Sequence, residues 1–337
     1  MVTGAPRTSR RADPPIVFSL DSVSTHADAI TRALHVEIAP HEERVFEDGE
    51  HKARPMVSVR DADVFVLDSV YGDPERSVND KLCRLLFFLG TLRDAGAARL
   101  TAVLPYLCYA RKDRRTKARD PVTTRYLACL LEAVGVDTVV TIDVHNVAAY
   151  QNAFRCRTEH LEGRPLFVRH LAPLIGDAPV SVVSPDAGGM KRAEQLRASL
   201  AHALGRDVAL ALLEKRRSDG TVSGTAVSGE VVGTTAIIID DLVSTGTTLA
   251  RAARACHERG ARRVLAAATH GLFTAGAAEA LTEAALEQLV VLNTVPPFRL
   301  PAGVVRDRLT VLDASPLLGE AIDRLHIGGS LAELSAD

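Results

Sequence analysis

The sequence predicts an α/β protein of two domains, each with a parallel sheet flanked by helices. One observation is length, because 337 residues are enough for two domains of roughly 100–200 residues each. A second is that short apolar runs alternate with longer segments of helical periodicity. The third is that polar residues follow several of the apolar runs, at the strand ends where ligands collect in open parallel sheets.

A first series of elements leads to a polar segment at Asp143-Val144-His145. Strands are predicted at 64–67, 100–104 and 138–142, and helices at 77–95 and from Thr123 or Thr124 to about Val134. A threonine can cap the start of the second helix, and Gly135 is a typical residue to end it. This order of strand, helix and strand indicates parallel pairing.

A second series follows with the same order of elements. Strands are predicted at 179–183, 208–213, 235–239 and 264–268, helices at 190–204 and 247–259, and an Ala-rich helix around 276–289. The run Thr235–Ile239 is apolar throughout, which is typical of a central parallel strand buried on both faces. The irregular stretch between Asn146 and Arg164 is the predicted domain boundary. The predicted division is a disordered tail at 1–15, one domain at 16–155 and another at 156–337.

Composition excludes several classes of protein. Apolar residues make up 47% and charged residues 24%, while the net charge of −2 provides no basic field for nucleic acid. No stretch approaches the roughly 20 apolar residues of a membrane span, and the first 15 residues lack the apolar core of a signal peptide. The cysteines number five and form no C-x-x-C pair, so neither a disulfide framework nor a zinc site is indicated. We therefore expect a cytoplasmic protein without a nucleic-acid or membrane partner.

The most informative segment joins the apolar strand 235–239 to the helix that starts near Thr247. Two adjacent acids, Asp240 and Asp241, precede a turn rich in hydroxyl groups, and the turn's residues are Ser244, Thr245, Gly246, Thr247 and Thr248. Glycine lets the backbone approach a ligand, and amides at a helix start bind phosphate. Helix capping alone would account for one hydroxyl group. The pattern indicates a sugar phosphate, with the carboxylates accepting from ribose hydroxyls.

This segment resembles the phosphoribosyl-binding motif that phosphoribosyltransferases share with ribose-phosphate pyrophosphokinases. The resemblance to the pyrophosphokinase family runs from about residue 16 to the end of the chain. It implies two domains of phosphoribosyltransferase type and a homo-oligomer. It also implies that Asp240, Asp241 and the turn from Ser244 to Thr248 bind ribose 5-phosphate.

Two segments of the first domain resemble the family's ATP-binding parts. The basic stretch after the strand 100–104 resembles the loop that holds ATP phosphates, which implies ATP contacts by Arg111, Lys112 and Asp113. The alternative is that this basic stretch is a solvated loop that binds no nucleotide. The family commonly has Gln where this chain has Lys112, so we predict an altered nucleotide preference. The other segment resembles the loop around adenine and its ribose, which implies contacts by Phe46, Asp48, Gly49 and Glu50.

Two segments resemble the family's metal-binding and catalytic parts. Asp186-Ala-Gly188-Gly189 follows a strand and resembles a family signature, which implies that Asp186, with His145, holds Mg²⁺ beside phosphate oxygens. Glu214-Lys215-Arg216-Arg217 resembles the start of a mobile catalytic loop. The resemblance makes Lys215 and Arg217 catalytic, with Arg217 also contacting ribose 5-phosphate. The Ser/Gly-rich stretch 218–229 is predicted to be a loop.

The resemblance implies one reaction: the pyrophosphoryl group of ATP moves to the 1-hydroxyl of ribose 5-phosphate, with Mg²⁺, and AMP leaves. Two alternatives remain at this point. A non-catalytic regulatory relative would be expected to lack part of the set Asp186, Lys215, Arg217, Asp240 and Asp241, and all five are present. A phosphoribosyltransferase would need the turn but not the segments around Phe46 and Arg111.

Overall fold

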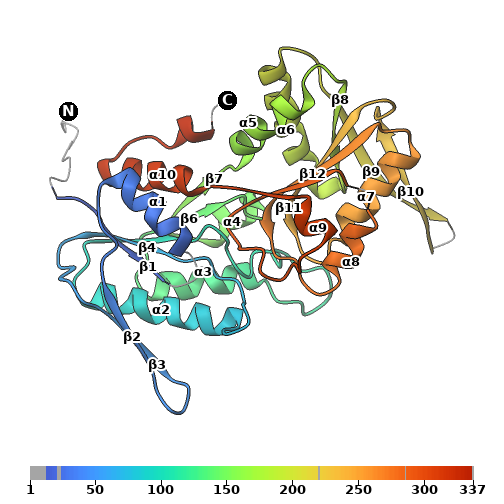
Figure 1. Cartoon of the computed structure of the whole chain (residues 1–337). Helices are drawn as coiled ribbons and strands as arrows, with labels where there is room; N and C mark the ends of the chain where they lie inside the picture. Colours follow the sequence, from blue (N-terminus) through green and yellow to red (C-terminus); the bar gives the residue numbers. More distant parts are fainter. Residues whose placement is uncertain (1–12, 21–23, 219–220, 285, 336–337) are drawn as a thin grey trace, which may run out of the picture. The chain divides into compact units, whose positions relative to one another are not determined.

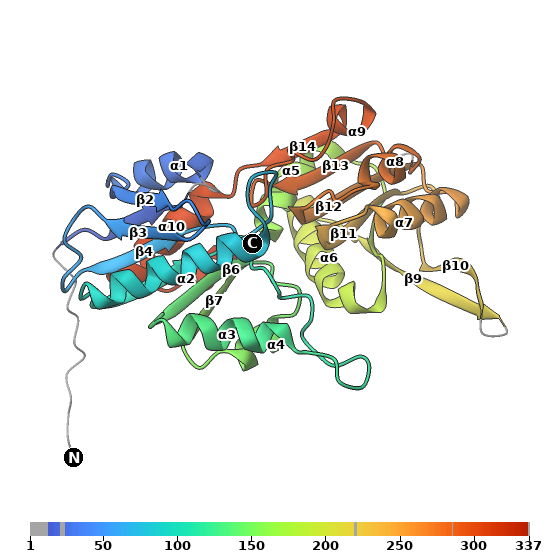
Figure 2. The same ribbon diagram turned by 90° about the horizontal axis from the view of Figure 1, so that it is seen from below.

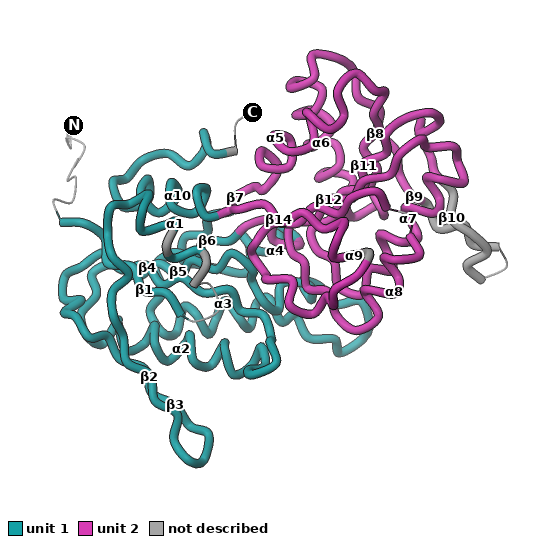
Figure 3. Tube along the Cα trace, viewed as in Figure 1, with its two compact units in different colours: residues 1–141, 146–160, 315–334 teal, residues 142–145, 161–314, 335–337 magenta. Residues whose placement is uncertain are grey.

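The computed structural model describes residues 13–20, 24–218, 221–284 and 286–335. The chain forms two compact units (Figure 3). Unit 1 comprises Met1–Thr141, Asn146–His160 and Ser315–Leu334, and unit 2 comprises Ile142–His145, Leu161–Ala314 and Ser335–Asp337. This division differs from the predicted boundary after residue 155, because the segment Ile142–His145 packs within unit 2 and the C-terminal helix packs within unit 1. Most of the predicted tail at 1–15 lies outside the described residues.

A five-stranded sheet forms the centre of unit 1. Its order is β1 (Ile16–Ser19), β4 (Asp63–Leu67), β5 (Arg99–Val103), β6 (Thr138–Ile142) and β7 (Arg157–Leu161). The pairs β1/β4, β4/β5 and β5/β6 are parallel. Every residue of β4 and β6 is buried, as expected of strands covered on both faces.

Five helices belong to unit 1: α1 (Ser24–Leu34), α2 (Val78–Asp94), α3 (Thr123–Ala133), α4 (Val147–Ala153) and α10 (Ser315–Ile327). Ser77 and Asp80 form a capping box at the start of α2, where each side chain accepts from the other residue's amide. A separate antiparallel hairpin, β2 (His41–Val45) and β3 (His51–Pro55), projects from this unit (Figure 1).

Helix α10 lies beside α1 and ties the C-terminal segment to unit 1 (Figure 1). The two helices approach so closely that a Cβ atom at Gly319 would lie 2.9 Å from the Cβ of Ala33. The end of α10 is fixed by a buried polar cluster, in which His326 Nδ1 lies 2.7 Å from a carboxylate oxygen of Asp63. Arg99 donates to both oxygens of Asp63 and, at 2.8 Å, to the carbonyl of Leu325. These contacts explain why the last helix belongs to the first unit.

Unit 2 contains a seven-stranded sheet. Its order is β10 (Thr221–Gly229), β9 (Ala209–Ser218), β8 (Val180–Ser184), β11 (Thr235–Val243), β12 (Arg263–Gly271), β13 (Gln288–Leu292) and β14 (Leu309–Leu312). All neighbours are parallel except β9 and β10, which form an antiparallel ribbon (Figure 2). The prediction of a loop at 218–229 is therefore wrong for the described residues, since most of that stretch pairs as β10.

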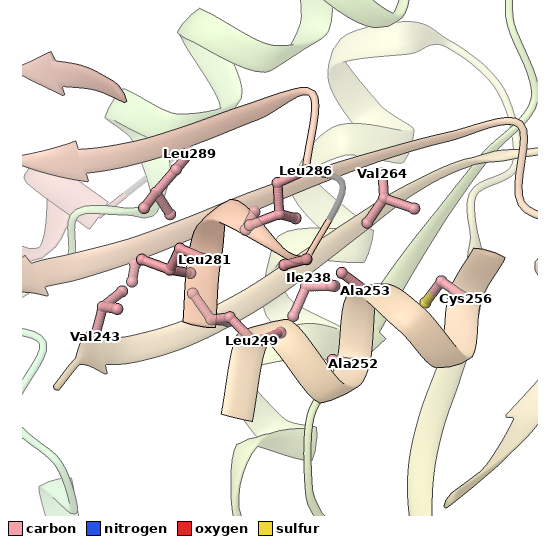
Figure 4. Packing of buried hydrophobic residues seen from close by; sticks show 14 of the residues in the cluster. Ile238, Val243, Leu249, Ala252, Ala253, Cys256, Val264, Leu281, Leu286 and Leu289 are labelled. Carbon is pink, nitrogen blue, oxygen red and sulfur yellow. The ribbon is translucent and has the colours of Figure 1, made fainter. Parts of the chain in front are cut away.

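The helices of unit 2 are α5 (Arg164–Ile175), α6 (Met190–Leu204), α7 (Thr247–Glu258), α8 (Ala277–Thr282) and α9 (Val304–Asp307). Leu249, Ala252 and Ala253 of α7 face the strands that carry Ile238 and Val264 (Figure 4). Small side chains on this face let the helix lie close to the sheet, so the core needs few aromatic rings. The packing fixes the start of α7 next to the end of β11.

Two further predictions of local structure are wrong. The stretch between Asn146 and Arg164 is not irregular, because it contains α4 and β7. The Ala-rich helix ends at Thr282, and Gln288–Leu292 is instead the parallel strand β13 between β12 and β14. In both cases, pairing with distant strands decides the conformation. Across the described residues, no helix combines the length and the apolar character needed to cross a bilayer.

Candidate active site

The two adjacent acids lie near the carboxyl end of β11, a strand between β8 and β12. The strand runs on to Val243, so both acids are inside it and not after it. The side chain of Asp241 is 6% exposed and that of Asp240 is 19% exposed. Asp240 accepts the amide hydrogen of Asp241 at 2.9 Å. Two carboxylates this close and this buried require a compensating charge.

Arg192, near the start of α6, supplies that charge. Its Nη1 lies 3.7 Å from Oδ1 of Asp240 and 3.8 Å from Oδ1 of Asp241. Burial, together with the neighbouring Asp241 carboxylate, raises the pKa of Asp240. Burial also opposes ionisation of Asp241, but a hydrogen bond from His145 and the charge of Arg192 outweigh it and lower the pKa of Asp241. Asp241 is therefore the carboxyl of the pair that ionises more readily.

His145 lies beside the acids, although it comes from the end of β6. Its Nδ1 is 2.7 Å from Oδ2 of Asp241, and its side chain is 42% exposed. The backbone before it has a left-handed conformation at Asp143, where φ is 41°. The carboxylate of Asp143 accepts from the amide of Gly163 at 3.0 Å and from the hydroxyl of Thr269 at 2.5 Å. These bonds hold the segment Ile142–His145 inside unit 2.

The turn after β11 has the geometry of an anion site. Gly246 adopts φ of 73°, and a Cβ atom there would lie 2.8 Å from Leu281 Cγ, so only glycine fits without strain. Among the described residues, no side chain caps the start of α7 at this glycine. Thr245 and Thr247 are exposed, with their hydroxyls 3.0 Å apart, and Ser244 pairs with Thr274 at 3.2 Å. The amides at the start of α7 and the hydroxyls of Thr245 and Thr247 are therefore hydrogen-bond donors in the same turn.

Asp186 caps a short 3₁₀-helix, η2 (Ala187–Gly189), that follows β8 and contacts β11. Its Oδ1 accepts the amide hydrogen of Gly189 at 3.0 Å, and the side chain is exposed. A Cβ atom at Gly189 would lie 2.8 Å from the hydroxyl of Ser184, so the turn is tight. The exposed carboxylate is therefore fixed in place beside the acid-bearing strand.

Asp120 organises the basic loop that follows β5. The ammonium of Lys112 lies 2.5 Å from Asp120 and 2.9 Å from the hydroxyl of Thr116. Asp120 also accepts from the amides of Thr116 and Lys117, and its pKa is lowered chiefly by Lys112. Arg111 is exposed in the same loop. The side chain of Lys112 therefore bonds within its own loop, whereas the side chain of Arg111 is exposed.

Asp113, in the same loop, accepts a hydrogen bond from the side-chain nitrogen Nδ2 of Asn146 at 2.5 Å. Asn146 also caps α4. This bond connects the basic loop to the segment that follows His145 in sequence.

Phe46, Asp48, Gly49 and Glu50 form the tip of the β2–β3 hairpin. The amide of Phe46 donates to the carbonyl of Glu50 at 2.7 Å, and Gly49 has a φ of 92°. The guanidinium of Arg44 lies 4.8 Å from the centroid of the Phe46 ring. One side of the ring is therefore occupied by a cation, and a base would have to stack on the other side or displace Arg44.

The backbone of Lys215 and Arg217 lies in β9, opposite Thr225 and Val222 of β10. The side chains of both residues lie outside the described part of the chain. The predicted catalytic roles of Lys215 and Arg217 stay predictions.

Unit 2 brings together four of the candidate groups: His145, the two acids and the turn of α7. It adds Arg192, which was not among the predicted site residues although it follows Asp186 closely in the sequence. No cluster of three or more His, Cys, Asp or Glu side chains suited to a metal occurs among the described residues.

Comparison with known proteins gives a consistent result along the chain. Residues 15–135 match the N-terminal domain of ribose phosphate pyrophosphokinase, and residues 213–335 match the phosphoribosyl synthetase-associated domain. A ribose-phosphate pyrophosphokinase from Caldanaerobacter subterraneus subsp. tengcongensis is 37% identical over 320 residues, which cover 94% of this chain and 96% of the relative. One from Hyphomonas neptunium is 37% identical over 309 residues, covering 91% and 95%.

A solved structure is also similar over nearly the whole chain. The crystal structure of phosphoribosylpyrophosphate synthetase from Mycobacterium smegmatis superposes with a TM-score of 0.83 at 32% identity, covering 94% of this chain and 100% of that one. This similarity confirms the predicted α/β fold with two domains of phosphoribosyltransferase type.

Proposed function

This chain belongs to the ribose-phosphate pyrophosphokinase family, and we propose that it transfers the pyrophosphoryl group of ATP to the 1-hydroxyl of ribose 5-phosphate. The products are 5-phosphoribosyl 1-pyrophosphate and AMP. The observation that carries the proposal is the end of β11, where a buried acid pair leads into an uncapped helix start rich in hydroxyl groups.

Ribose 5-phosphate is proposed to bind at this end of β11. The 5-phosphate would accept hydrogen bonds from the amides of residues 245–248 and from the hydroxyls of Thr245 and Thr247. The ribose hydroxyls would donate to the acid pair, and Arg217 would add positive charge. The positive φ of Gly246 supports this assignment, because it bends the backbone toward the ligand position.

ATP is proposed to bind through the hairpin tip and the basic loop of unit 1. Arg111 is an exposed guanidinium, whose planar fork suits phosphate oxygens. Phe46 offers an aromatic face for adenine, with Asp48, Gly49 and Glu50 around it. Asp113 and Lys112 order this loop through Asn146 and Asp120, and both are proposed to contact the nucleotide.

The residues present fit Mg²⁺, which is proposed to bind at Asp186 and His145. Mg²⁺ keeps several waters and takes one or two protein ligands plus substrate phosphates, so a site with few protein ligands suits it. The exposed carboxylate of Asp186 accepts the amide hydrogen of Gly189, and the contact of His145 Nδ1 with Asp241 fixes the orientation of the ring. When bound, the ion would offset the negative charge of the phosphates.

The proposed chemistry is an in-line displacement. The 1-oxygen of ribose 5-phosphate forms a bond to the β-phosphorus of ATP and loses its proton, while the bond from that phosphorus to the oxygen bridging the α-phosphate breaks. AMP leaves with that oxygen. The protein's part is to position the reactants and to stabilise charge on phosphate oxygens. Lys215 and Arg217 are proposed to supply donors for that charge.

The test is to incubate the protein with ATP, Mg²⁺ and ribose 5-phosphate. AMP and phosphoribosyl pyrophosphate are expected in equal amounts, and AMP should not form when ribose 5-phosphate is omitted. A phosphoribosyltransferase would release no AMP from this mixture. A regulatory relative would bind the ligands without turnover, and either result would contradict the proposal.

Lys112 provides a prediction about nucleotide choice. We expect Lys112→Gln to raise the preference for ATP over GTP and CTP, measured as the ratio of kcat/KM values, by about fivefold, the value of one neutral hydrogen bond of about 1 kcal/mol. An ammonium only donates, and here it is bound to Asp120, whereas an amide can both donate to and accept from the adenine edge. Lys117→Gln is the control, because it removes the same charge from a residue that contacts Asp120 only through its backbone. Equal ratios in wild type and Lys112→Gln would show that Lys112 does not affect base choice.

A homo-oligomer is also proposed, on the basis of family membership alone. Light scattering coupled to gel filtration tests this directly, and a monomeric mass at micromolar concentration would contradict it.

A further inference from the structure

The β2–β3 hairpin has the candidate adenine residues at its tip, and it forms a two-stranded sheet of its own, with five residues in each strand. A hairpin of this kind is only marginally stable in water unless it packs against a further element. Its base is anchored to β1, because the amide of Ala39 donates to the carbonyl of Val17 at 2.8 Å. The tip begins about five residues further along, roughly 17 Å at the usual rise of a strand. The position of the tip therefore depends on what holds the two strands.

Helix α2 holds the first strand through an ion pair whose arginine is buried. The side chain of Arg84 is 4% exposed, and its Nε donates to Oε2 of Glu43 on β2 at 2.6 Å. Its Nη2 donates to the other oxygen of the same carboxylate. On the same face of β2, Nε2 of His41 lies 2.9 Å from Oε1 of Glu43. Burial opposes ionisation of Glu43, but the bonds from His41 and Arg84 outweigh it and lower the pKa of this carboxyl. The pair is therefore charged at neutral pH.

A second contact from the same helix holds the other strand. The ring of His51, the first residue of β3, stacks on Phe87 of α2 with the ring centroids 5.6 Å apart. Arg84 and Phe87 are three positions apart, which places them side by side on the helix surface. His51 lies opposite Val45 in the hairpin, and Phe46 follows Val45 directly. Helix α2 therefore holds both strands between the base of the hairpin and its tip.

The geometry of the ion pair suits positioning more than stability. Two parallel hydrogen bonds from a guanidinium to a carboxylate fix both the distance and the direction of the contact. A buried ion pair adds little net stability over apolar side chains of the same volume. A useful comparison is Glu42, which lies 2.6 Å from Arg54, with side chains that are 38% and 58% exposed. That pair joins β2 to β3, so it cannot set the position of the hairpin on α2.

We propose that Arg84 and Glu43 are positioning residues for the nucleotide: their ion pair sets the hairpin on α2 and so places Phe46 where adenine stacks. The inference rests on the proposed function and deepens it, since it concerns two residues that have no assigned contact with a substrate. It implies a selective loss. Without the pair, the base should be bound more weakly, while the phosphates, which the loop around Arg111 is proposed to bind, should be bound as before.

The experiment compares Glu43→Gln with Glu42→Gln, which remove one charge each from neighbouring residues of β2 and keep the side-chain volume. Affinities for ATP and for inorganic tripolyphosphate, which has no base, are measured by calorimetry with Mg²⁺ and without ribose 5-phosphate. Phe46→Ala should lower ATP affinity about 5–150-fold, the range for removing one stack of a base on an aromatic ring. Glu43→Gln should lower it at least about fivefold, the lower end of that range.

The controls should show no such loss. Glu42→Gln should keep the ATP affinity of wild type within about twofold, because an exposed ion pair contributes little. In every variant, tripolyphosphate affinity should stay within about twofold of wild type, as expected when a substitution and a binding site are distant and independent. A role of the pair in overall stability alone would not distinguish the two ligands.

Two further variants separate positioning from damage to the fold. Arg84→Met combined with Glu43→Leu replaces the ion pair by apolar side chains, a change that often leaves stability unaltered or raises it. ATP affinity should nevertheless fall as it does in Glu43→Gln. Adding Glu43→Gln to Phe46→Ala should cost little more than Phe46→Ala alone, because two residues that act through one contact are not additive.

Three results would overturn the proposal. One is wild-type ATP affinity in both Glu43→Gln and the apolar double variant. Another is a loss of tripolyphosphate affinity as large as the loss of ATP affinity, which would indicate general damage. The third is that the losses in Glu43→Gln and Phe46→Ala multiply, or that Phe46→Ala binds ATP like wild type. A protein that binds ATP and forms no AMP would refute the proposed function, whereas these binding measurements would still decide the role of the ion pair.

Discussion

Replacing Lys215 by alanine is expected to slow turnover at least about a hundredfold and to leave ATP affinity near that of wild type. Removing a charge or donor that acts on oxygens gaining negative charge typically costs on the order of 10²–10³ in rate. If the contact forms only as the β-phosphorus changes partners, kcat and kcat/KM fall together while binding is retained. Steady-state kinetics combined with calorimetry of ATP binding provides the measurement.

Controls for this prediction lie on the same strand. Arg217→Ala should show a related loss. Arg216→Ala removes the same charge from the residue between them and should change kcat only a few-fold, because the family resemblance assigns it no role. The backbone of all three residues pairs with β10, so the comparison holds the local fold constant. Near-native turnover of Lys215→Ala would contradict the catalytic assignment of β9.

Replacing Asp63 by alanine is expected to lower the free energy of unfolding by about 3 kcal/mol, the low end of the cost of removing one partner from a buried ion pair. Asp63 is 1% exposed on its side chain, and it receives hydrogen bonds from Arg99 and His326. Without the carboxylate, the guanidinium and the imidazole at the end of α10 lose their common acceptor. The midpoint of urea unfolding, followed by far-UV circular dichroism, measures the change.

Glu320→Ala is the matched control for Asp63→Ala. Glu320 also pairs with an arginine, Arg324 of its own helix α10, at 2.8 Å, but its side chain is 50% exposed. An exposed i, i+4 pair contributes little to stability, so the midpoint should hardly move. Equal shifts in the two variants would show that the buried cluster does not hold α10 in place.

The elements that the sequence predicts best are those whose own residues determine their conformation. The strands β4, β6 and β11 each contain a run of apolar residues, which is typical of a parallel strand covered on both faces. Helix α2 likewise begins at its own capping box.

The wrong predictions concern segments whose conformation depends on a pairing partner that their own composition does not show. The stretch 288–292 continues an Ala-rich helical pattern, but β12 and β14 pair with it on both sides. The Ser/Gly-rich stretch 221–229 has the composition of a loop and pairs with β9. The last helix lies far from the rest of unit 1 in sequence, and the cluster at Asp63 and the contact with α1 join it to that unit.

The candidate site shows the same distinction. The residue types and their places near the ends of strands could be read from the sequence, because motifs are local. The contact between His145 and Asp241 joins residues that are 96 positions apart in the sequence. The position of Arg192 close to both acids depends on how α6 packs on the sheet. Such contacts leave no local pattern, so the different surroundings of Asp240 and Asp241 emerge only from the fold.

The most direct test of the proposed function follows the β-phosphate of ATP. With ATP labelled by ³²P at the β-position, in the presence of Mg²⁺ and ribose 5-phosphate, the label should leave the nucleotide and appear in phosphoribosyl pyrophosphate, with unlabelled AMP as the other product. Label that stays in the nucleotide as ADP would show transfer of the γ-phosphate alone. That result, or no transfer at all, would contradict the assignment of this chain as a pyrophosphokinase.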